Sequence, residues 1–398
     1  MVCKFWYNTT ACAPSLWAHV DVYERIKAKK GPVAYISEHT LLWLQRAKGA
    51  AIHLHFSNLL QHSFEDSELA RVFAPYAPSI ASLEFCGNFH SQAVQDVLTV
   101  CHHHATPGTL KHLEICTTET IPILPSLDTV ATPLKMPQAV TSLRLYGVHA
   151  TPFFSMGQVL EMLSSSPQIH TLQLDDLFLY NSESLPTSAI PLHSLRVLDL
   201  TQRGDSDLPR LLSVISTGDS NVHLTLDFRT NPRRLVEAVK EFCQKSEVST
   251  LVLRIGSTPI SEAYSIPSVQ NLALDLRYDG IYKNLDCFMQ QAGAVVSVQR
   301  LYIVDKNRIP NLRERASIQR IVNICGPDEL HFIGCAVMGA PPFDNWYDHY
   351  LRTEENMYEW LSKRVGQLTI DYPPKYVVDY GMKWDPLSLQ SDSETCTF

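Results

Sequence analysis

The sequence is poor in glycine and in charge, and it has no long apolar run. Among 398 residues only 16 are glycine and 19% are charged, against a usual charged share of about 25%. No apolar stretch approaches the roughly 18 residues that a membrane-spanning helix needs, so we expect no membrane partner. The net charge is −8. An acidic chain has no general attraction for phosphate backbones, so we expect no nucleic-acid partner.

Catalytic signatures are absent as well. The sequence contains no GxSxG, HExxH, GxxxxGK[ST] or GxGxxG motif, which predicts binding rather than chemistry: no enzyme activity and no cofactor. Its ten cysteines include no CxxC pair. We therefore expect buried, reduced thiols and a cytoplasmic or nuclear protein.

Two histidine clusters raise the question of a metal site. Cys101 to His104 are consecutive, but neighbours on a helix point about 100° apart and do not easily close a tetrahedral site. His53 and His55 share the outer face of a predicted strand, and Glu84 on the next strand is a conceivable further ligand. Solvated histidines are the simpler interpretation, so we predict no metal.

Leucine, by contrast, is abundant and periodic. It occupies 48 positions, and a recurring motif places an apolar residue three positions before a central leucine and another two positions after it. Consecutive central leucines are 21 to 38 residues apart, with a mean of about 28.5, which is the period of a repeat protein. The central leucines are Leu54, Leu83, Leu113, Leu143, Leu172, Leu198, Leu224, Leu251, Leu272, Leu301, Leu330 and Leu368, of which Leu224 and Leu330 carry only a partial form of the motif.

This pattern predicts an α/β fold made of repeated strand and helix units. In LEF (83–85), LEI (113–115), LRL (143–145) and LQL (172–174) a polar residue alternates between two apolar ones, as in a half-buried strand. We expect helices at residues 68–77, 91–103, 157–165, 208–217 and 233–244. Strand, turn and helix within about 28 residues is a leucine-rich-repeat unit. We predict a horseshoe-shaped solenoid of about 12 irregular units, with parallel strands on the concave face and helices on the convex face. The alternative, a doubly wound sheet, would have continuously apolar strands.

The segment before the repeats carries two tryptophan motifs. Residues 2–22 read VCKFWYNTTACAPSLWAHVDV. They resemble the end of an F-box, as fungal F-box proteins place it before leucine-rich repeats. The residues matching the F-box pattern at the adaptor side are Val2, Cys3, Trp6, Pro14, Leu16 and Trp17. We expect a partial F-box-like segment at 1–24, a linker at 25–42, the solenoid at 43–372 and an unpacked tail at 373–398.

The resemblance implies a substrate-recognition subunit of an SCF-type cullin-RING ubiquitin ligase. Its partners would be the SCF adaptor protein, if the full F-box exists, and an unknown protein substrate. The first two F-box helices, which form most of the adaptor-docking surface, would precede Met1. Either this chain is a fragment or the helices are lost. In the second case it is a leucine-rich-repeat scaffold with no ligase role.

The polar positions beside the central leucines predict where a partner binds. Side chains one and three residues after each leucine point away from the core, onto the concave face. Acidic groups dominate there, and charge complementarity predicts a partner with a basic segment; a merely solvated acidic face is the alternative. The predicted contact residues are Glu84, Glu114, Arg144, Asp175, Asp199, Asp227, Arg254, Asp275 and Tyr302.

Overall fold

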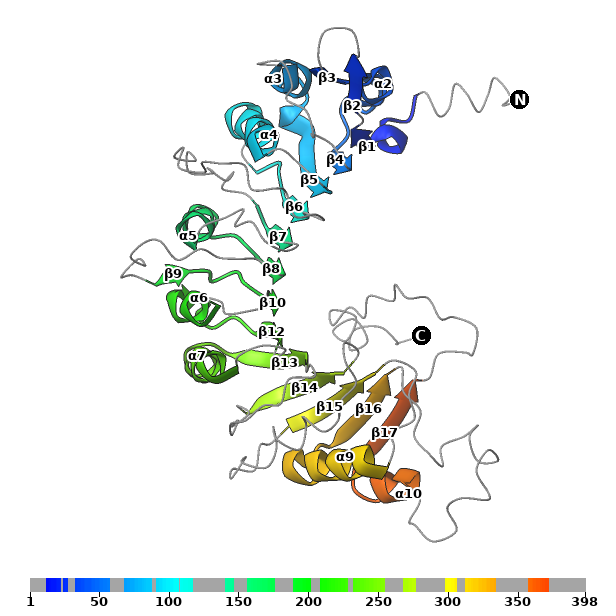
Figure 1. Ribbon diagram of the computed structural model, residues 1–398, viewed down its shortest axis with the longest axis vertical. Helices are drawn as coiled ribbons and strands as arrows, with labels where there is room; N and C mark the ends of the chain where they lie inside the picture. The colour runs from blue at the N-terminus through cyan, green and yellow to red at the C-terminus, as the bar shows by residue number, and fades with distance from the viewer. Residues whose placement is uncertain are drawn as a thin grey trace, which may run out of the picture.

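One long parallel sheet dominates the computed structural model. The model describes residues 12–22, 24–27, 33–57, 68–87, 91–106, 108–116, 140–146, 156–175, 189–201, 208–227, 232–254, 268–276, 298–305, 312–333 and 357–371. Thirteen strands lie side by side in the order in which they occur in the sequence, and Figure 1 shows them following an arc with the helices along its outer side. The fold is therefore the predicted α/β solenoid of the leucine-rich-repeat kind.

The strands are short, as the alternating motifs require. Those of the long sheet are β1 (His19–Val22), β4 (Ile52–Ser57), β5 (Ile80–Cys86), β6 (His112–Cys116), β7 (Ser142–Tyr146), β8 (Thr171–Asp175), β10 (Val197–Thr201), β12 (Val222–Asp227), β13 (Val248–Arg254), β14 (Val269–Asp275), β15 (Val298–Val304), β16 (Glu329–Ile333) and β17 (Gln367–Asp371). Two small sheets accompany it, an antiparallel pair of β2 (Glu24–Lys27) with β3 (Val33–Ile36) and a parallel pair of β9 (Ile190–Pro191) with β11 (Ile215–Ser216).

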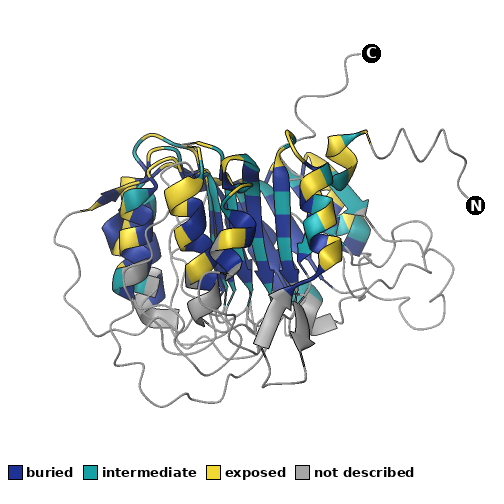
Figure 2. Ribbon diagram, turned by 90° about the horizontal axis from the view of Figure 1, so that it is seen from above, coloured by how far each residue is buried: buried dark blue, intermediate teal, exposed yellow. Residues whose placement is uncertain are grey.

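Helices return the chain from one strand to the next. All five predicted helices are present, although two are shorter than expected because α3 ends at Phe73 and α6 ends at Val214. The helical elements are η1 (Pro14–Trp17), α2 (Glu38–Arg46), α3 (Glu68–Phe73), η2 (Ala77–Ser79), α4 (Ser91–His104), α5 (Met156–Ser165), α6 (Leu208–Val214), α7 (Pro232–Lys245), α9 (Leu312–Cys325) and α10 (Met357–Ser362). Their buried sides face the sheet, and their exposed residues lie outward (Figure 2). None of the described helices is long and apolar enough to span a membrane.

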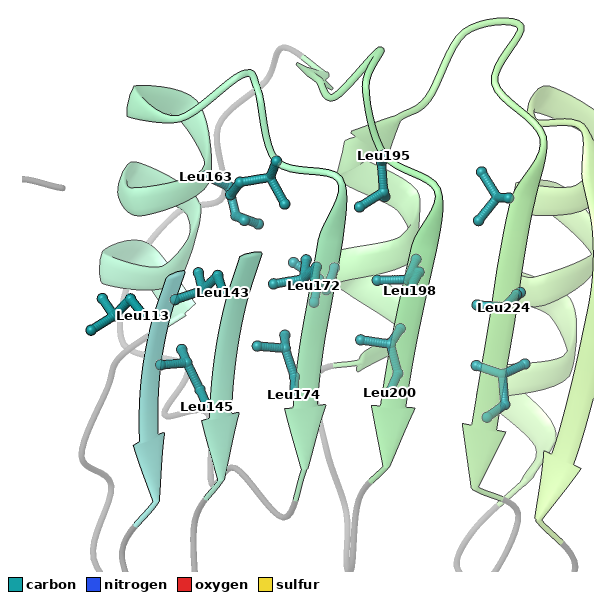
Figure 3. Close-up of a cluster of buried hydrophobic side chains, with 14 of the residues drawn as sticks. Leu113, Leu143, Leu145, Leu163, Leu172, Leu174, Leu195, Leu198, Leu200 and Leu224 are labelled. Carbon is teal, nitrogen blue, oxygen red and sulfur yellow. The ribbon is translucent and has the colours of Figure 1, made fainter. Parts of the chain in front are cut away.

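The central leucines form one continuous row across the sheet. Each pairs with the next in register, from Leu54 with Leu83 at one end to Leu330 with Leu368 at the other. All except Leu368, on the last strand, are at most 1% exposed. Figure 3 shows part of this row beside the parallel row two residues further on. Each buried leucine contributes about 1.5 to 3 kcal/mol relative to an exposed one, so the repeated motif is also the core.

Aromatic packing reinforces the core at the N-terminal end. The Phe56 ring on β4 stacks on Phe85 of β5 with centroids 4.6 Å apart, and it meets Phe73 of α3 edge-on at 5.6 Å. These three rings are fully buried. They join two strands to the helix that follows the first, which is the contact that a single repeat unit cannot make alone.

The N-terminal end differs from the sequence expectation. The sheet begins at β1, inside the segment assigned to the F-box, and Val20 pairs there with Leu54. Residues 25–42, expected to be a linker, contain most of β2, all of β3 and the start of α2. The Thr40 hydroxyl on α2 donates a hydrogen bond to the Asp21 carbonyl at 3.1 Å. This segment is therefore packed onto the first strand, because an open solenoid end needs a cover.

Candidate protein-binding surface

The face of the sheet opposite the central leucines carries polar side chains in three rows. Because strand side chains alternate, residues one before, one after and three after each leucine share this face, which we call the polar face. It lies on the inner side of the arc, away from the helices (Figure 1). Register pairing places equivalent positions of neighbouring repeats next to each other, as for Glu84, Glu114 and Arg144 on β5, β6 and β7. The surface is thus built by repetition of one short motif.

Histidine and aspartate occupy the first two strands of this face. The rings of His19 and His53 are stacked with centroids 4.6 Å apart, and Nδ1 of His55 hydrogen-bonds Oδ1 of Asp21 at 3.0 Å. Burial and the neighbouring His19 lower the pKa of His53, while the Glu84 carboxylate opposes the shift. A positive charge on His53 would lie against the neighbouring ring and is disfavoured. Protonation of His53 in acid should therefore weaken the packing of the two rings.

The next strands bring charges of both signs together. Arg144 lies 3.7 Å from Oε2 of Glu114, and His112 lies 3.5 Å from the same oxygen. The Ser82 hydroxyl donates to Glu84 at 3.4 Å. These side chains keep part of their surface in water, with Arg144 33% and Glu114 19% exposed. We call the polar face from β1 to β8 the charged half; its acidic groups remain partly available to a partner.

A tyrosine extends the charged half toward the middle of the arc. The Tyr146 hydroxyl donates to Oε1 of Gln173 on the next strand at 3.0 Å. Burial and the nearby Glu114 carboxylate raise the pKa of Tyr146, so the phenol stays neutral and acts as a hydrogen-bond donor. Asp175 lies beside it in register and is half-buried.

A single arginine holds the middle of the face together. Both terminal nitrogens of Arg254, on β13, lie 3.2 Å from the carboxylate oxygens of Asp199, on β10. Arg254 also donates to the Thr201 hydroxyl and lies 3.9 Å from Asp275. Burial raises the pKa of Asp199, and Arg254 and Thr201 oppose that shift. Asp199 is therefore already paired with a cation within the protein, and Asp275 lies against the same guanidinium.

Beyond this network the position after the central leucine is closed to solvent on three strands, although Arg300 and Glu329, one residue before their leucines, are partly exposed and lie 3.0 Å apart. Val252, Ala273 and Tyr302 form a separate apolar cluster on β13, β14 and β15, with Ile333 packed against it. The Tyr302 ring stacks on His331 at 4.7 Å. The cluster is at most 5% exposed, so its members do not offer free contact area.

The structure places all nine predicted contact residues on the polar face, but not in equivalent surroundings. Glu84, Glu114, Arg144 and Asp175 lie in the charged half. Asp199 and Arg254 are engaged with each other. Asp227, Asp275 and Tyr302 are buried at 3%, 0% and 5% exposure.

The F-box-like residues fall partly outside the described chain. Val2, Cys3 and Trp6 are not among the described residues. Pro14, Leu16 and Trp17 form the single turn η1, which leads into β1. Leu16 is 63% exposed, whereas the Trp17 ring lies beneath the Arg46 guanidinium at 4.4 Å.

Sequence reasoning missed the first strand of the face and one of its side-chain pairs. Asp21 and His19 lie in the segment assigned to the F-box, although His19-Val20-Asp21-Val22 has the same alternation as the later motifs.

In the part of the chain that the structure describes, no three His, Cys, Asp or Glu side chains are grouped to hold a metal ion.

The fold and its open polar face define a class of protein, a repeat solenoid suited to binding other proteins. Comparison with known proteins does not narrow that class further, because no protein-family model matches the sequence and no curated protein is significantly similar to it.

Proposed function

We propose that this protein captures a protein partner on the charged half of its polar face and performs no chemistry itself. The observation that supports this most directly is a continuous row of partly exposed ionic side chains running over five neighbouring strands, Asp21, His55, Glu84, Glu114 and Arg144. A solenoid presents such a row as one extended surface, on which a peptide segment or a domain edge contacts several repeats at once.

The partner that fits this surface carries a basic segment. Of the acidic side chains on the face, Asp21, Glu84, Glu114 and Asp175 keep partial exposure near the N-terminal end. Asp199 and Asp275 already face Arg254, and the partly exposed Glu329 is paired with Arg300. Surface charges of one sign steer a partner of the opposite sign and disfavour wrong partners. The acidic residues proposed to contact the partner therefore lie toward the N-terminal end of the arc.

The finer proposal is that the protein is the substrate-recognition subunit of an SCF-type cullin-RING ubiquitin ligase. It rests on the F-box-like residues at the N-terminus and on one structural feature. Leu16 on η1 and Leu42 on α2 are 63% and 39% exposed, the large hydrophobic side chains with substantial exposure among the described residues. They lie on two elements in contact at the N-terminal end, where upstream F-box helices would pack. The receptor would hold its substrate near the ligating enzyme and raise the effective concentration.

Co-purification with the SCF adaptor tests this proposal. The product of the full transcript is expected to capture the adaptor, and Leu16→Asp is expected to weaken that capture about tenfold or more because it puts a charge at an apolar contact. Since Leu16 is exposed, the variant keeps its fold. Glu84→Gln with Glu114→Gln is the matched control and should leave adaptor capture unchanged.

If a product that carries a complete F-box still does not bind the adaptor, the ligase proposal fails. The alternative is then a leucine-rich-repeat scaffold with no ubiquitin-ligase role. If the protein still binds a basic partner through the charged half, the scaffold alternative holds. If it binds no basic partner either, the scaffold alternative fails as well.

A further inference from the structure

Two cysteines lie opposite each other on the polar face. Cys86 and Cys116 occur at the same place in consecutive repeats, three residues after Leu83 and Leu113. They are register partners at the carboxyl ends of β5 and β6. Both are half-buried and reduced in this structure, and the two thiol groups are hydrogen-bonded to each other.

This arrangement satisfies the geometry of a disulfide. Neighbouring strands are about 4.7 to 4.9 Å apart, within the range of about 4.4 to 6.8 Å that Cα atoms span in disulfides. Residues at equivalent positions of parallel register point to the same side of the sheet. The register of β5 and β6 therefore places the two cysteines within the Cα separation that a disulfide spans.

We propose that Cys86 and Cys116 form a reversible intramolecular disulfide when the protein meets a low-molecular-weight disulfide such as oxidised glutathione. The thiolate of one cysteine attacks a glutathione sulfur, which forms a mixed disulfide and releases one reduced glutathione. The second cysteine attacks the protein sulfur of that mixed disulfide and releases the other glutathione. Two thiol protons and two electrons pass to oxidised glutathione, which becomes two molecules of reduced glutathione.

The positions of the other described cysteines make disulfide formation selective for Cys86 and Cys116. Cys101, Cys243 and Cys325 lie in or against the core, where burial raises the pKa of each thiol to about 12. They lie on helices α4, α7 and α9 rather than on strands of the long sheet. Of the described cysteines, Cys86 and Cys116 alone combine partial exposure with a facing thiol.

The carboxylates of the charged half control how fast the pair reacts. The hydrogen bond with Cys116 and burial raise the pKa of Cys86, and Glu114 and Glu84 raise it further. Because the thiolate is the attacking species, closure should speed up as pH rises. It should also speed up when the carboxylates are neutralised. The disulfide would lie beside Glu84 and Glu114. Any effect of the disulfide on partner capture rests on the proposed function, but its formation does not depend on that function.

The experiment incubates the full chain with excess oxidised glutathione at mildly alkaline pH, blocks free thiols and maps peptides by mass spectrometry. We expect a linked peptide pair containing Cys86 and Cys116 that disappears on reduction. Cys86→Ser and Cys116→Ser should each abolish it, and Cys12→Ser, at an exposed cysteine, should not. Glu84→Gln with Glu114→Gln should raise the closure rate about 3- to 10-fold and shift its pH profile to lower pH.

The proposal is overturned if both thiols remain reduced or if they carry only separate glutathione adducts. It is also overturned if either one pairs with another cysteine instead. All of these readouts come from the wild-type chain and do not depend on whether a variant folds. Partner capture, measured separately with and without reductant, tests the functional consequence, so its failure leaves the disulfide standing.

Discussion

Arg254 on β13 reaches across the whole of β12 to bind Asp199 on β10, with both nitrogen-to-oxygen distances at 3.2 Å. The two side chains are 16% and 15% exposed, so the pair is largely withdrawn from water. It ties together strands that are 55 residues apart in sequence. Asp199 therefore belongs to the structure of the face rather than to its free contact area.

Breaking this pair should destabilise the protein. Arg254→Met leaves the buried Asp199 carboxylate without its cation, and we expect a loss of about 2 to 4 kcal/mol in the free energy of unfolding. Urea unfolding measures it. The double variant Arg254→Met with Asp199→Asn should recover part of the loss. If the two single changes are additive in a double-mutant cycle, the pair contributes no interaction energy.

The leucine row should carry the stability of the repeats. Leu143→Ala removes a fully buried side chain and should cost about 2 to 5 kcal/mol. The adjacent Arg144→Ala removes a partly exposed ion pair and should cost less than about 1 kcal/mol. Denaturant unfolding of the two variants compares a core position with its surface neighbour. Equal costs would contradict the assignment of faces.

Stability should fall in acid through His53. Its pKa is lowered in the folded state by burial and by His19, so the unfolded chain takes up a proton at a pH where the folded protein does not. The contribution of neutral His53 to the free energy of unfolding is fully present above the unfolded pKa of about 6.5. It is lost as pH falls through the pKa of His53 in the folded protein.

Unfolding curves collected across this pH range measure the effect. His53→Gln should flatten the pH dependence, and His103→Gln, an exposed histidine at the end of α4, is the matched control. An unchanged slope in His53→Gln would show that the pKa of His53 is not lowered as described.

Partner capture should depend on the open acidic groups of the charged half. Glu84→Gln with Glu114→Gln should weaken binding to a Lys- and Arg-rich peptide several-fold and reduce its salt dependence, because surface charges act through screened attraction. Fluorescence anisotropy at several salt concentrations measures both effects. Glu161→Gln with Glu241→Gln, exposed on α5 and α7, should change neither. Equal binding by both double variants would make the acidic face a solvated surface only.

The sequence predicted the repeated part of this fold well because each unit carries its own signal. A leucine flanked by apolar residues at fixed distances defines both the strand and the side that it buries, and all twelve predicted positions lie in paired strands. Prediction was less good at the N-terminal end. There Val20 and Val22 take the places of the two core residues, and a motif defined by leucine does not detect them.

The chemistry of the polar face followed the sequence only in part. Its residues could be identified by counting from each leucine, and Cys86 and Cys116 could have been found in the same way, since both stand three residues after a central leucine. The sequence could not show which residues of the polar face remain exposed to a partner. Tyr302 and Arg144 occupy equivalent repeat positions, yet one is buried in an apolar cluster and the other is partly exposed.

The sequence by itself determined the architecture, because the spacing of leucines fixes strand, register and buried side through interactions within one repeat and with its immediate neighbours. Only the tertiary structure decided which polar side chains are available. Arg254 meets Asp199 across an intervening strand, and Asp275 is buried although it stands at the same repeat position as the half-buried Asp175. Exposure and charge pairing depend on side chains brought together from distant repeats, and a local periodic signal contains no information about those contacts.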